Sequence, residues 1–366
     1  MRSIVFTGGG TGGHIFPGLA VIEQLDRREH QIRWIGSSSG IDRSLVESAD
    51  ISFYGIPSGK LRRYASLKNF FDLFKIVAGF FCSLVLLIRF RPDVLFSKGG
   101  FVSVPPCFAS RLLGIPVITH ECDFSPGLAT RLNARIASKI LVSYPETARF
   151  FSETTRARIT VTGNPVRSAF YSGDPDAGRA FLSFTDNSLP IIFFQGGSLG
   201  AVQINDLVFE SLPLLLPTCN IVHQTGQSTV SGAPPCTDPL VAQRYRPFPF
   251  IRGEMADVLA ASYIVVSRSG ANTIWECAAA GKPMILVPLE KGSSRGDQVE
   301  NASYFQERGA ACVLSGDQAT AAQLVTLIHS LADNSPAYQV IQKASSALGS
   351  HRPSQIIADI IRGYVQ

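Results

Sequence analysis

The 366-residue chain is poor in charge and has no cysteine pairing pattern. Asp, Glu, Lys and Arg make up 17% of the residues and hydrophobic residues 45%, which excludes an intrinsically disordered chain. The seven cysteines include no Cys-x-x-Cys pair and are odd in number, which favours isolated thiols over a disulfide framework or a zinc site. No His, Cys or Asp cluster has metal-ligand spacing, so no metal is expected. No signal peptide precedes the first strand, and we expect a cytosolic protein.

A further absence concerns dinucleotide binding. Gly8, Gly10 and Gly13 match the glycine spacing of the NAD and FAD fingerprint. That fingerprint also requires an acidic residue at the end of the second strand, where this chain has Gly36-Ser37-Ser38-Ser39. We therefore expect neither cofactor.

Two glycine-rich turns, about 190 residues apart, are the most informative feature that is present. An apolar strand runs into Gly8–His14, and a second one runs into Gly196–Gly200. Such turns let the backbone approach a ligand, and the helix that follows favours an anion. Two of them, in a chain of alternating strand and helix patterns, predict an α/β protein with two parallel sheets that face each other across a cleft.

The strand pattern and the turn residues at Gly163-Asn164-Pro165 divide the chain into two predicted domains, residues 1–163 and 164–346. The C-terminal segment 347–366, with a helix over 353–365, is expected to return to the first domain. The predicted strands are 4–7, 31–35, 51–56, 94–97, 117–120, 140–142 and 159–162 in the first domain, and 191–195, 220–224, 246–250, 263–267, 284–287 and 311–314 in the second.

Charge is concentrated in one segment. Residues 1–163 carry a net charge of +8 and the rest −3, and residues 60–91 alone hold seven basic residues and one acid. The apolar run 76–88 forms a helix of only about 20 Å, too short for a hydrocarbon core of about 30 Å. A buried core helix is one interpretation. Aromatic residues interleaved with basic ones favour contact with an anionic membrane over nucleic acid. The predicted membrane patch is Lys68, Phe71, Phe74 and Lys75.

The segment 265–283 reads as a strand, a turn and a short helix. Ser269 or Gly270 can begin the helix, which makes its first residues a phosphate site. Glu276 lies on the face of Asn272 and Thr273, where a carboxylate accepts ribose hydroxyls; a solvated acid is the alternative. Downstream, the polar residues Asp297, Gln298 and Asn301 either bind sugar hydroxyls or cap a helix.

His14 ends the first glycine turn, at the start of the helix that follows. Histidine titrates near neutral pH, so it is a candidate general base. A helix-entry residue without chemistry is the alternative. The position at the carboxyl end of a parallel strand favours function.

Six segments form an ordered set along the chain: Gly8–Gly18, Ser97–Ser103, His120-Glu121, Gly163–Arg167, Gly196–Ser198 and Arg268–Glu276. Taken in this order, they closely resemble the MurG family, the bacterial transferases that add N-acetylglucosamine to the membrane-bound muramoyl-pentapeptide precursor of peptidoglycan. The matches run from residue 7 to about residue 302.

The resemblance implies a GT-B fold and an inverting transfer from UDP-N-acetylglucosamine to the C4 hydroxyl of the lipid-linked muramoyl sugar. It implies a peripheral enzyme on the cytoplasmic face of the bacterial inner membrane. Glu276 would bind the ribose, and Ser198, Arg167 and Ala271–Thr273 the diphosphate. The implied UDP-N-acetylglucosamine site is Thr11, Gly12, Gly13, Arg167, Ser198, Ala271, Asn272, Thr273, Glu276, Asp297, Gln298 and Asn301. The implied acceptor side is Thr11, His14, Gly99, Gly100 and Asp123, with His14 as base.

Two positions depart from the family pattern. The family usually has Gln-Asn where this chain has Cys122-Asp123, and an acid in place of an amide loses two donors. The family also often has a polar residue at the position of Leu199. The rival functions are a UDP-N-acetylglucosamine 2-epimerase, which has no use for a membrane patch, another GT-B lipid glycosyltransferase with a different donor, and a non-enzymatic nucleotide-binding adaptor, which would not require His14.

Overall fold

The computed structural model describes residues 2–59, 67–197, 200–226, 239–289, 296–332 and 334–365, with the backbone alone at 67–71 and 240. The chain forms two compact units. The first unit joins Met1–Arg167 to Arg352–Gln366, and the second is Ser168–His351.

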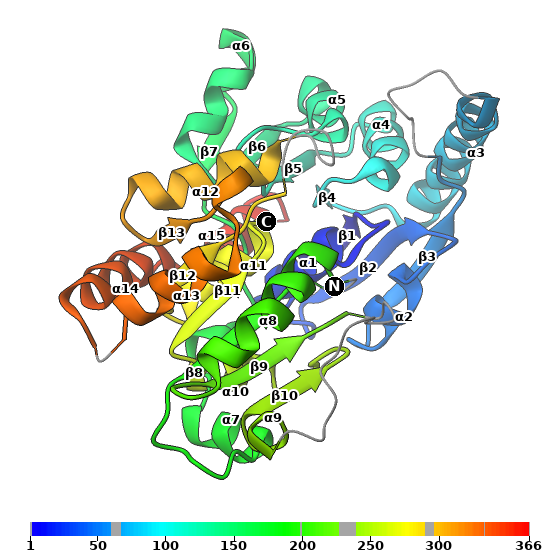
Figure 1. Ribbon diagram of the computed structural model, residues 1–366. Helices are drawn as coiled ribbons and strands as arrows, with labels where there is room; N and C mark the ends of the chain where they lie inside the picture. Colours follow the sequence, from blue (N-terminus) through cyan, green and yellow to red (C-terminus); the bar gives the residue numbers. More distant parts are fainter. Residues whose placement is uncertain are drawn as a thin grey trace. The chain divides into compact units, whose positions relative to one another are not determined.

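The first unit is built on a parallel sheet of seven strands in the order β3-β2-β1-β4-β5-β6-β7 (Figure 1). Its strands are β1 (Arg2–Thr7), β2 (His30–Ser37), β3 (Ser52–Ile56), β4 (Val94–Ser97), β5 (Val117–Glu121), β6 (Lys139–Val142) and β7 (Ile159–Val161). Its helices are α1 (Gly12–Ile22), α2 (Asp42–Glu47), α3 (Leu67–Phe90), α4 (Val104–Leu112), α5 (Leu128–Ile136), α6 (Glu153–Arg156) and α15 (Pro353–Arg362), with the 3-10 turns η1 (Phe101–Ser103) and η2 (Pro145–Phe150).

The second unit repeats the plan with six parallel strands in the order β10-β9-β8-β11-β12-β13. Its strands are β8 (Ile191–Gln195), β9 (Asn220–Gln224), β10 (Tyr245–Phe248), β11 (Ile264–Ser267), β12 (Met284–Leu286) and β13 (Ala311–Val313). Its helices are α7 (Pro175–Leu182), α8 (Val202–Leu215), α9 (Pro239–Arg244), α10 (Met255–Ala261), α11 (Ala271–Ala279), α12 (Asp297–Glu307), α13 (Ala321–Ser330) and α14 (Pro336–Gly349), with the 3-10 turns η3 (Ser168–Tyr171) and η4 (Gly316–Gln318).

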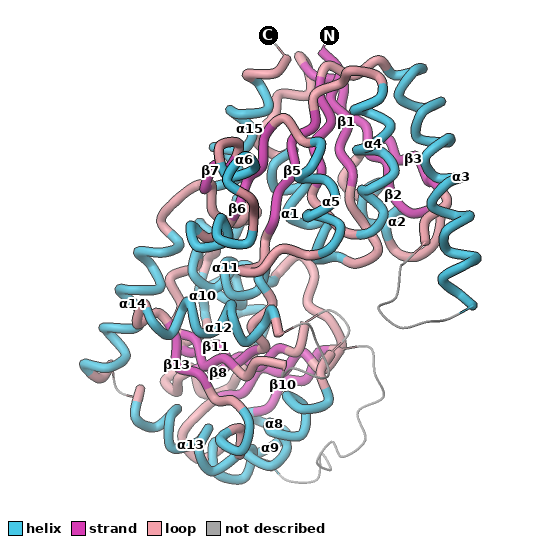
Figure 2. The backbone as a smooth tube through the Cα atoms, turned by 90° about the horizontal axis from the view of Figure 1, so that it is seen from above, coloured by secondary structure: helices cyan, strands magenta, loops and turns pink. Residues whose placement is uncertain are grey.

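The central strands of both sheets are buried along their length because helices cover them (Figure 2). In the first unit, alternate residues of β1 enter different cores. Ile4 and Phe6 pack with residues of α1 and α15, and Val5 packs with residues of α3 and α4. All thirteen predicted strands are present, with ends that differ by at most two residues. The prediction of two parallel α/β units is confirmed.

Strand order reverses direction beside β1 in the first sheet and beside β8 in the second. In such sheets the ligand site lies at the carboxyl ends of the strands that flank this reversal. The two glycine turns follow β1 and β8, and the turns after β4 and β11 lie next to them. The topology therefore gives each unit one pair of turns at its switch point.

The division between the units differs from the predicted one by a few residues. The predicted boundary after Gly163 assigned Arg167 to the second domain, and that assignment is wrong. Arg167 belongs to the first unit, where its guanidinium lies 5.2 Å from the centre of the Phe16 ring. The chain re-enters the first unit at Arg352, and α15 packs there through Ile357 and Ile361.

The helix α3 contradicts the predicted short apolar helix. It spans 24 residues, about 36 Å, because the residues before Ile76 are also helical and the first break is Arg91, at φ 45°. By length and composition alone, Asp72–Phe90 could cross a membrane, with a mean hydropathy of 2.1. Only 22% of that window is buried, so α3 is not a buried core helix either.

The second unit contains a histidine whose burial makes folding pH-dependent. His223 of β9 is buried between the Tyr245 hydroxyl, 2.8 Å from Nδ1, and Asn205 Oδ1, 3.0 Å from Nε2. Burial lowers the pKa of His223 to about 4. As pH falls from about 6.5 toward 4, the unfolded chain takes up a proton and the folded chain does not.

We predict that the free energy of unfolding falls over this pH range by up to about 3 kcal/mol and that His223→Gln removes this dependence. Urea unfolding at pH 7, 6 and 5 measures it, with His329→Gln, at an exposed position of α13, as the control that keeps the dependence. A wild-type midpoint that does not change with pH would contradict the prediction.

Candidate active site

Two turns of the first unit approach each other closely at its switch point. The Lys98 amide donates to the carbonyl of Thr7 at 2.8 Å, which joins the end of β4 to the end of β1. Gly10, Gly99 and Gly100 have φ values of 85°, 87° and 78°, which favour glycine. A Cβ on Gly100 would lie 2.8 Å from the carbonyl oxygen of Gly9. Glycine is thus required here by backbone conformation and by space.

His14 lies against this pair of turns. Its amide donates to the carbonyl of Thr11 at 3.1 Å in the first turn of α1. The side chain is half-buried, and a Cβ on Gly100 would lie 2.9 Å from its Cδ2. Thr11 and Gly13 are exposed at the same helix start, while Gly12 is buried. The structure therefore brings His14, Gly99 and Gly100 together, with Thr11 at the same helix start, and their role toward the acceptor stays a prediction.

Lys98 is a buried cation for which the sequence pattern predicted no role. Its side chain is 1% exposed, and within the described residues its Nζ has no hydrogen-bond partner. Burial and the charge of Lys98 hold the pKa of His120 well below its usual value, so this imidazole is neutral. His120 Nε2 lies 3.0 Å from the carbonyl oxygen of Gly163. An unpartnered buried ammonium between two glycine turns favours an anionic ligand.

Asp123 follows β5 in a loop held by its neighbour Glu121. The Glu121 carboxylate accepts backbone N–H bonds from Cys122, Asp123 and Gly127 at 2.9, 3.1 and 3.0 Å. The potential ligand atoms of Glu121, Cys122 and Asp123 lie within 4.8 Å of one another. These three consecutive residues fold into one tight turn, and the expectation that the chain binds no metal stays a prediction. Because the Glu121 carboxylate already accepts three backbone N–H bonds, its evident role is to hold the loop that follows β5.

The second unit has a corresponding glycine turn after β8. A Cβ on Gly196 would lie 2.4 Å from the Ala201 amide nitrogen, and one on Gly200 would lie 2.3 Å from the Thr225 carbonyl oxygen. Gly197 and Gly200 have φ values of 86° and 80°. Ser198 and Leu199 lie outside the described residues.

The adjacent turn after β11 opens the helix α11. Gly270 is its N-cap and provides no side chain, so the first amides of α11, at Ala271, Asn272 and Thr273, precede the intrahelical bonds and face the turn. Glu276 lies half-buried on this helix, whose apolar side is buried through Ile274. The structure thus places Ala271, Asn272, Thr273 and Glu276 together, as predicted.

Gln298 and Asn301 hold this turn from α12. The Ser269 hydroxyl donates to the Gln298 carbonyl at 2.7 Å, and Asn301 Nδ2 donates to the Ser269 carbonyl at 3.2 Å. Gln298 Oε1 accepts from the Leu289 amide at 3.1 Å. Asp297 is half-buried at the first position of α12. The sequence left sugar binding and capping open for these residues, and the two amides bind backbone.

Arg268, next to Ser269, is the cation of the second unit at this turn. Its side chain is half-buried, burial lowers its pKa, and its Nε has no hydrogen-bond partner within the described residues. Arg268 lies within the segment that resembles the family, but the sequence pattern predicted no role for it. Its place directly after a parallel strand was the available signal.

The chain matches the family models of both halves of one enzyme family. Residues 4–142 match the glycosyltransferase family 28 N-terminal domain, and residues 191–357 match the family 28 C-terminal domain. A relative from Treponema denticola is 51% identical over 100% of this chain and 98% of its own length. A Treponema pallidum relative is 48% identical over 100% and 96%. Both are named UDP-N-acetylglucosamine–N-acetylmuramyl-(pentapeptide) pyrophosphoryl-undecaprenol N-acetylglucosamine transferase.

Solved structures agree on the fold. MurG from Acinetobacter baumannii aligns over 99% of this chain and 100% of its own, with a TM-score of 0.72 and 27% identity. UDP-GlcNAc 2-epimerase from Neisseria meningitidis aligns over 99% and 100%, with a TM-score of 0.70 but 14% identity, so that likeness concerns the fold alone.

Proposed function

The chain belongs to glycosyltransferase family 28, and from this premise we propose that it transfers N-acetylglucosamine from UDP-N-acetylglucosamine to lipid-linked N-acetylmuramoyl-pentapeptide. The observation that carries the proposal is 51% identity over the whole chain to a relative named for this reaction. The epimerase alternative is not favoured, because its support is a shared fold at 14% identity.

The proposed reaction needs a base that removes the proton of the acceptor hydroxyl and positive charge that stabilises the leaving UDP. The C4 hydroxyl oxygen of the muramoyl sugar forms a bond to the anomeric carbon of N-acetylglucosamine. The bond from that carbon to the UDP oxygen breaks, and UDP leaves with the electron pair and inversion at carbon. His14 takes the hydroxyl proton.

We assign the donor to the second unit. The first amides of α11 and the Arg268 guanidinium would receive the diphosphate, because a helix N-terminus and a guanidinium both bring positive charge to this turn. Glu276 would bind the ribose hydroxyls and Asp297 the sugar, while Gln298 and Asn301 shape the turn that they hold. Ser198 and, from the first unit, Arg167 remain proposed diphosphate ligands, as do Thr11, Gly12 and Gly13 for the donor sugar.

The acceptor is assigned to the first unit, at His14, Gly99 and Gly100, with Asp123 on the loop after β5. The buried Lys98 ammonium supports an anionic group here, and the relatives' names give the acceptor a pyrophosphoryl group. A bound diphosphate would neutralise the Lys98 ammonium and so offset the free-energy cost of burying this charge without a partner.

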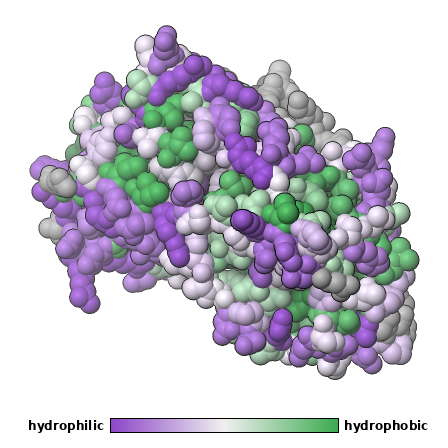
Figure 3. Space-filling model, turned by 90° about the vertical axis from the view of Figure 1, so that its left-hand side faces the viewer, coloured by the Kyte–Doolittle hydropathy of each residue, from purple (hydrophilic) through white to green (hydrophobic). Residues whose placement is uncertain are grey.

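Contact with a membrane surface is supported by α3. Six large apolar side chains are between 47% and 66% exposed along this helix: Leu73, Phe74, Val77, Phe81, Val85 and Ile88. We call them the α3 stripe. Lys75 is 57% exposed beside it. The side chains of Lys68 and Phe71 lie outside the described residues. By contrast, the face of the molecule in Figure 3 carries its apolar residues in several small areas among polar ones.

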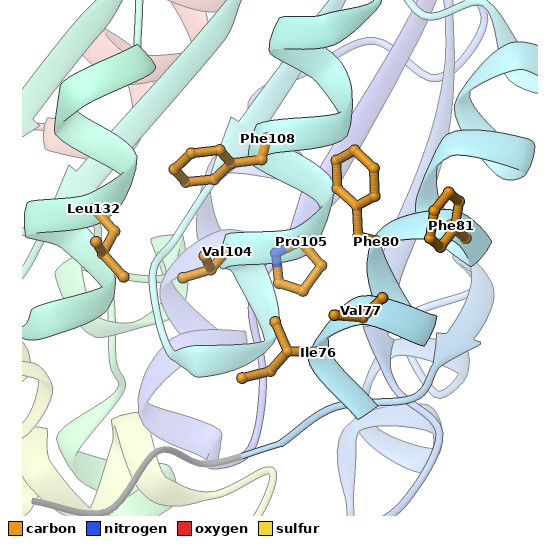
Figure 4. A pocket seen from close by; sticks show the side chains of 8 residues that line it. All are labelled: Ile76, Val77, Phe80, Phe81, Val104, Pro105, Phe108 and Leu132. Atoms are coloured by element: carbon orange, nitrogen blue, oxygen red, sulfur yellow. The ribbon is translucent and has the colours of Figure 1, made fainter. Parts of the chain in front are cut away.

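An open apolar groove of about 450 Å³ adjoins the stripe, between α3, α4 and α5 (Figure 4). It is lined by Ile76, Val77, Phe80, Phe81, Val104, Pro105, Phe108 and Leu132. We propose that stripe and groove together sit on anionic lipid at the cytoplasmic face of the bacterial membrane, with the enzyme bound peripherally.

Transfer of radiolabelled N-acetylglucosamine tests the function. We predict that label from UDP-N-acetylglucosamine enters a short-chain lipid-linked muramoyl-pentapeptide, and that UDP-galactose and UDP-glucose give no labelled lipid. UDP binding without any transfer would contradict the proposed acceptor. Formation of UDP-N-acetylmannosamine, or of N-acetylmannosamine and UDP by its hydrolysis, would instead favour the epimerase.

Membrane contact is tested with a matched pair of valines. Val85 of the α3 stripe is 66% exposed, and Val340 of α14 is 63% exposed. We predict that Val85→Asp weakens binding to anionic phospholipid vesicles by about fivefold or more, because each charge near the surface contributes about 1 kcal/mol. Val340→Asp should leave vesicle co-sedimentation unchanged. Equal losses in both variants, or none in Val85→Asp, would contradict the membrane assignment.

A further inference from the structure

Asp42 is a buried carboxylate bonded to the backbone of the first glycine turn. It is the first residue of α2 and has 0% exposure. Its Oδ1 and Oδ2 accept from the Gly10 amide at 2.9 and 3.1 Å, and Oδ2 also accepts from the Ser37 amide at 2.9 Å. Burial raises the pKa of Asp42, and the two backbone bonds lower it by less.

The turn fits closely around this carboxylate. A Cβ on Gly9 would lie 1.9 Å from Asp42 Oδ2. Beside it, the Trp34 indole Nε1 donates to the Gly8 carbonyl at 3.0 Å. Two side chains, one from β2 and one from α2, therefore hold the turn two residues apart, at the Gly8 carbonyl and at the Gly10 amide.

The held turn leads directly to His14. Gly10 is followed by Thr11, the N-cap of α1, whose carbonyl accepts from the His14 amide. On the opposite side, Gly100 leaves no room for a Cβ between the Gly9 carbonyl and the His14 ring. Since the turn is confined on both sides, loss of the Asp42 bonds would shift His14 relative to Gly99 and Gly100.

We propose that Asp42 is a positioning residue for the acceptor side of the reaction, fixing the Gly8–Gly10 backbone and through it the place of the His14 imidazole. The inference rests on the proposed role of His14. It also explains the missing dinucleotide fingerprint. The acid stands five residues beyond β2 and binds the Gly10 amide, so this amide is bonded within the protein and does not face a cofactor pyrophosphate.

Asp42→Asn is the sharpest variant because it keeps the shape and replaces one acceptor oxygen with an NH2 donor that faces a backbone N–H. Asp93→Asn is the matched control. Asp93 Oδ2 accepts from the Ser3 amide at 2.8 Å, so it bonds the same strand β1 at its other end.

We expect Asp42→Asn to lower kcat/KM for the acceptor by about tenfold, the size of a lost hydrogen bond to a charged group, and to leave UDP affinity unchanged. Asp93→Asn should change neither quantity. An unchanged acceptor kcat/KM in Asp42→Asn, or equal losses in both variants, would overturn the proposal. A mere loss of stability would lower the acceptor kcat/KM and the UDP affinity together.

Amide hydrogen exchange supplies a readout that does not depend on activity. The Gly10 and Ser37 amides should exchange faster in Asp42→Asn than in the wild type, while those of the second unit keep their rates. Unchanged exchange at Gly10 would overturn the proposal even where activity falls. Absence of transfer by the wild type in the same assay would instead refute the proposed function, and the exchange result would still decide whether Asp42 holds the turn.

Discussion

The close approach of two glycine turns at the end of β1 and β4 is the constraint on which the first unit depends. Gly100 leaves no room for a side chain between the Gly9 carbonyl and His14, and the Lys98 amide bonds the Thr7 carbonyl. This contact exists because the strand order reverses beside β1, which brings the two turns to one place. The His14 side chain, the buried Lys98 and the start of α1 meet at this place.

The second unit has the same topology but gathers different charged groups at its switch point. Its turns after β8 and β11 gather the amides of α11 and the Arg268 guanidinium, which suit a leaving diphosphate. The first unit instead has a histidine at its turn, with Lys98 behind it. In the proposed reaction both substrates carry a diphosphate, and each unit has positive charge at its switch point that would receive one of them.

The sequence predicted the strands and both glycine turns because apolar runs and glycine spacing are local signals. It missed Asp42, since nothing in the residues around it shows that α2 turns this carboxylate toward Gly10. The length of α3 was underestimated because only its apolar run was counted. Gln298 and Asn301 could be placed at a turn but not assigned to sugar or backbone, since amides bind both. In the structure one amide atom of each contacts Leu289 or Ser269, and their part in sugar binding stays a prediction.

The central claim is that chemistry belongs to the first unit and donor binding to the second. The most direct test measures kcat and the UDP Kd for His14→Ala and Glu276→Ala side by side. We predict that His14→Ala lowers kcat by about 10²-fold or more and leaves the UDP Kd within about twofold. Glu276→Ala should weaken UDP binding instead. A His14→Ala enzyme with a near-normal kcat, or unchanged UDP binding in Glu276→Ala, would contradict it.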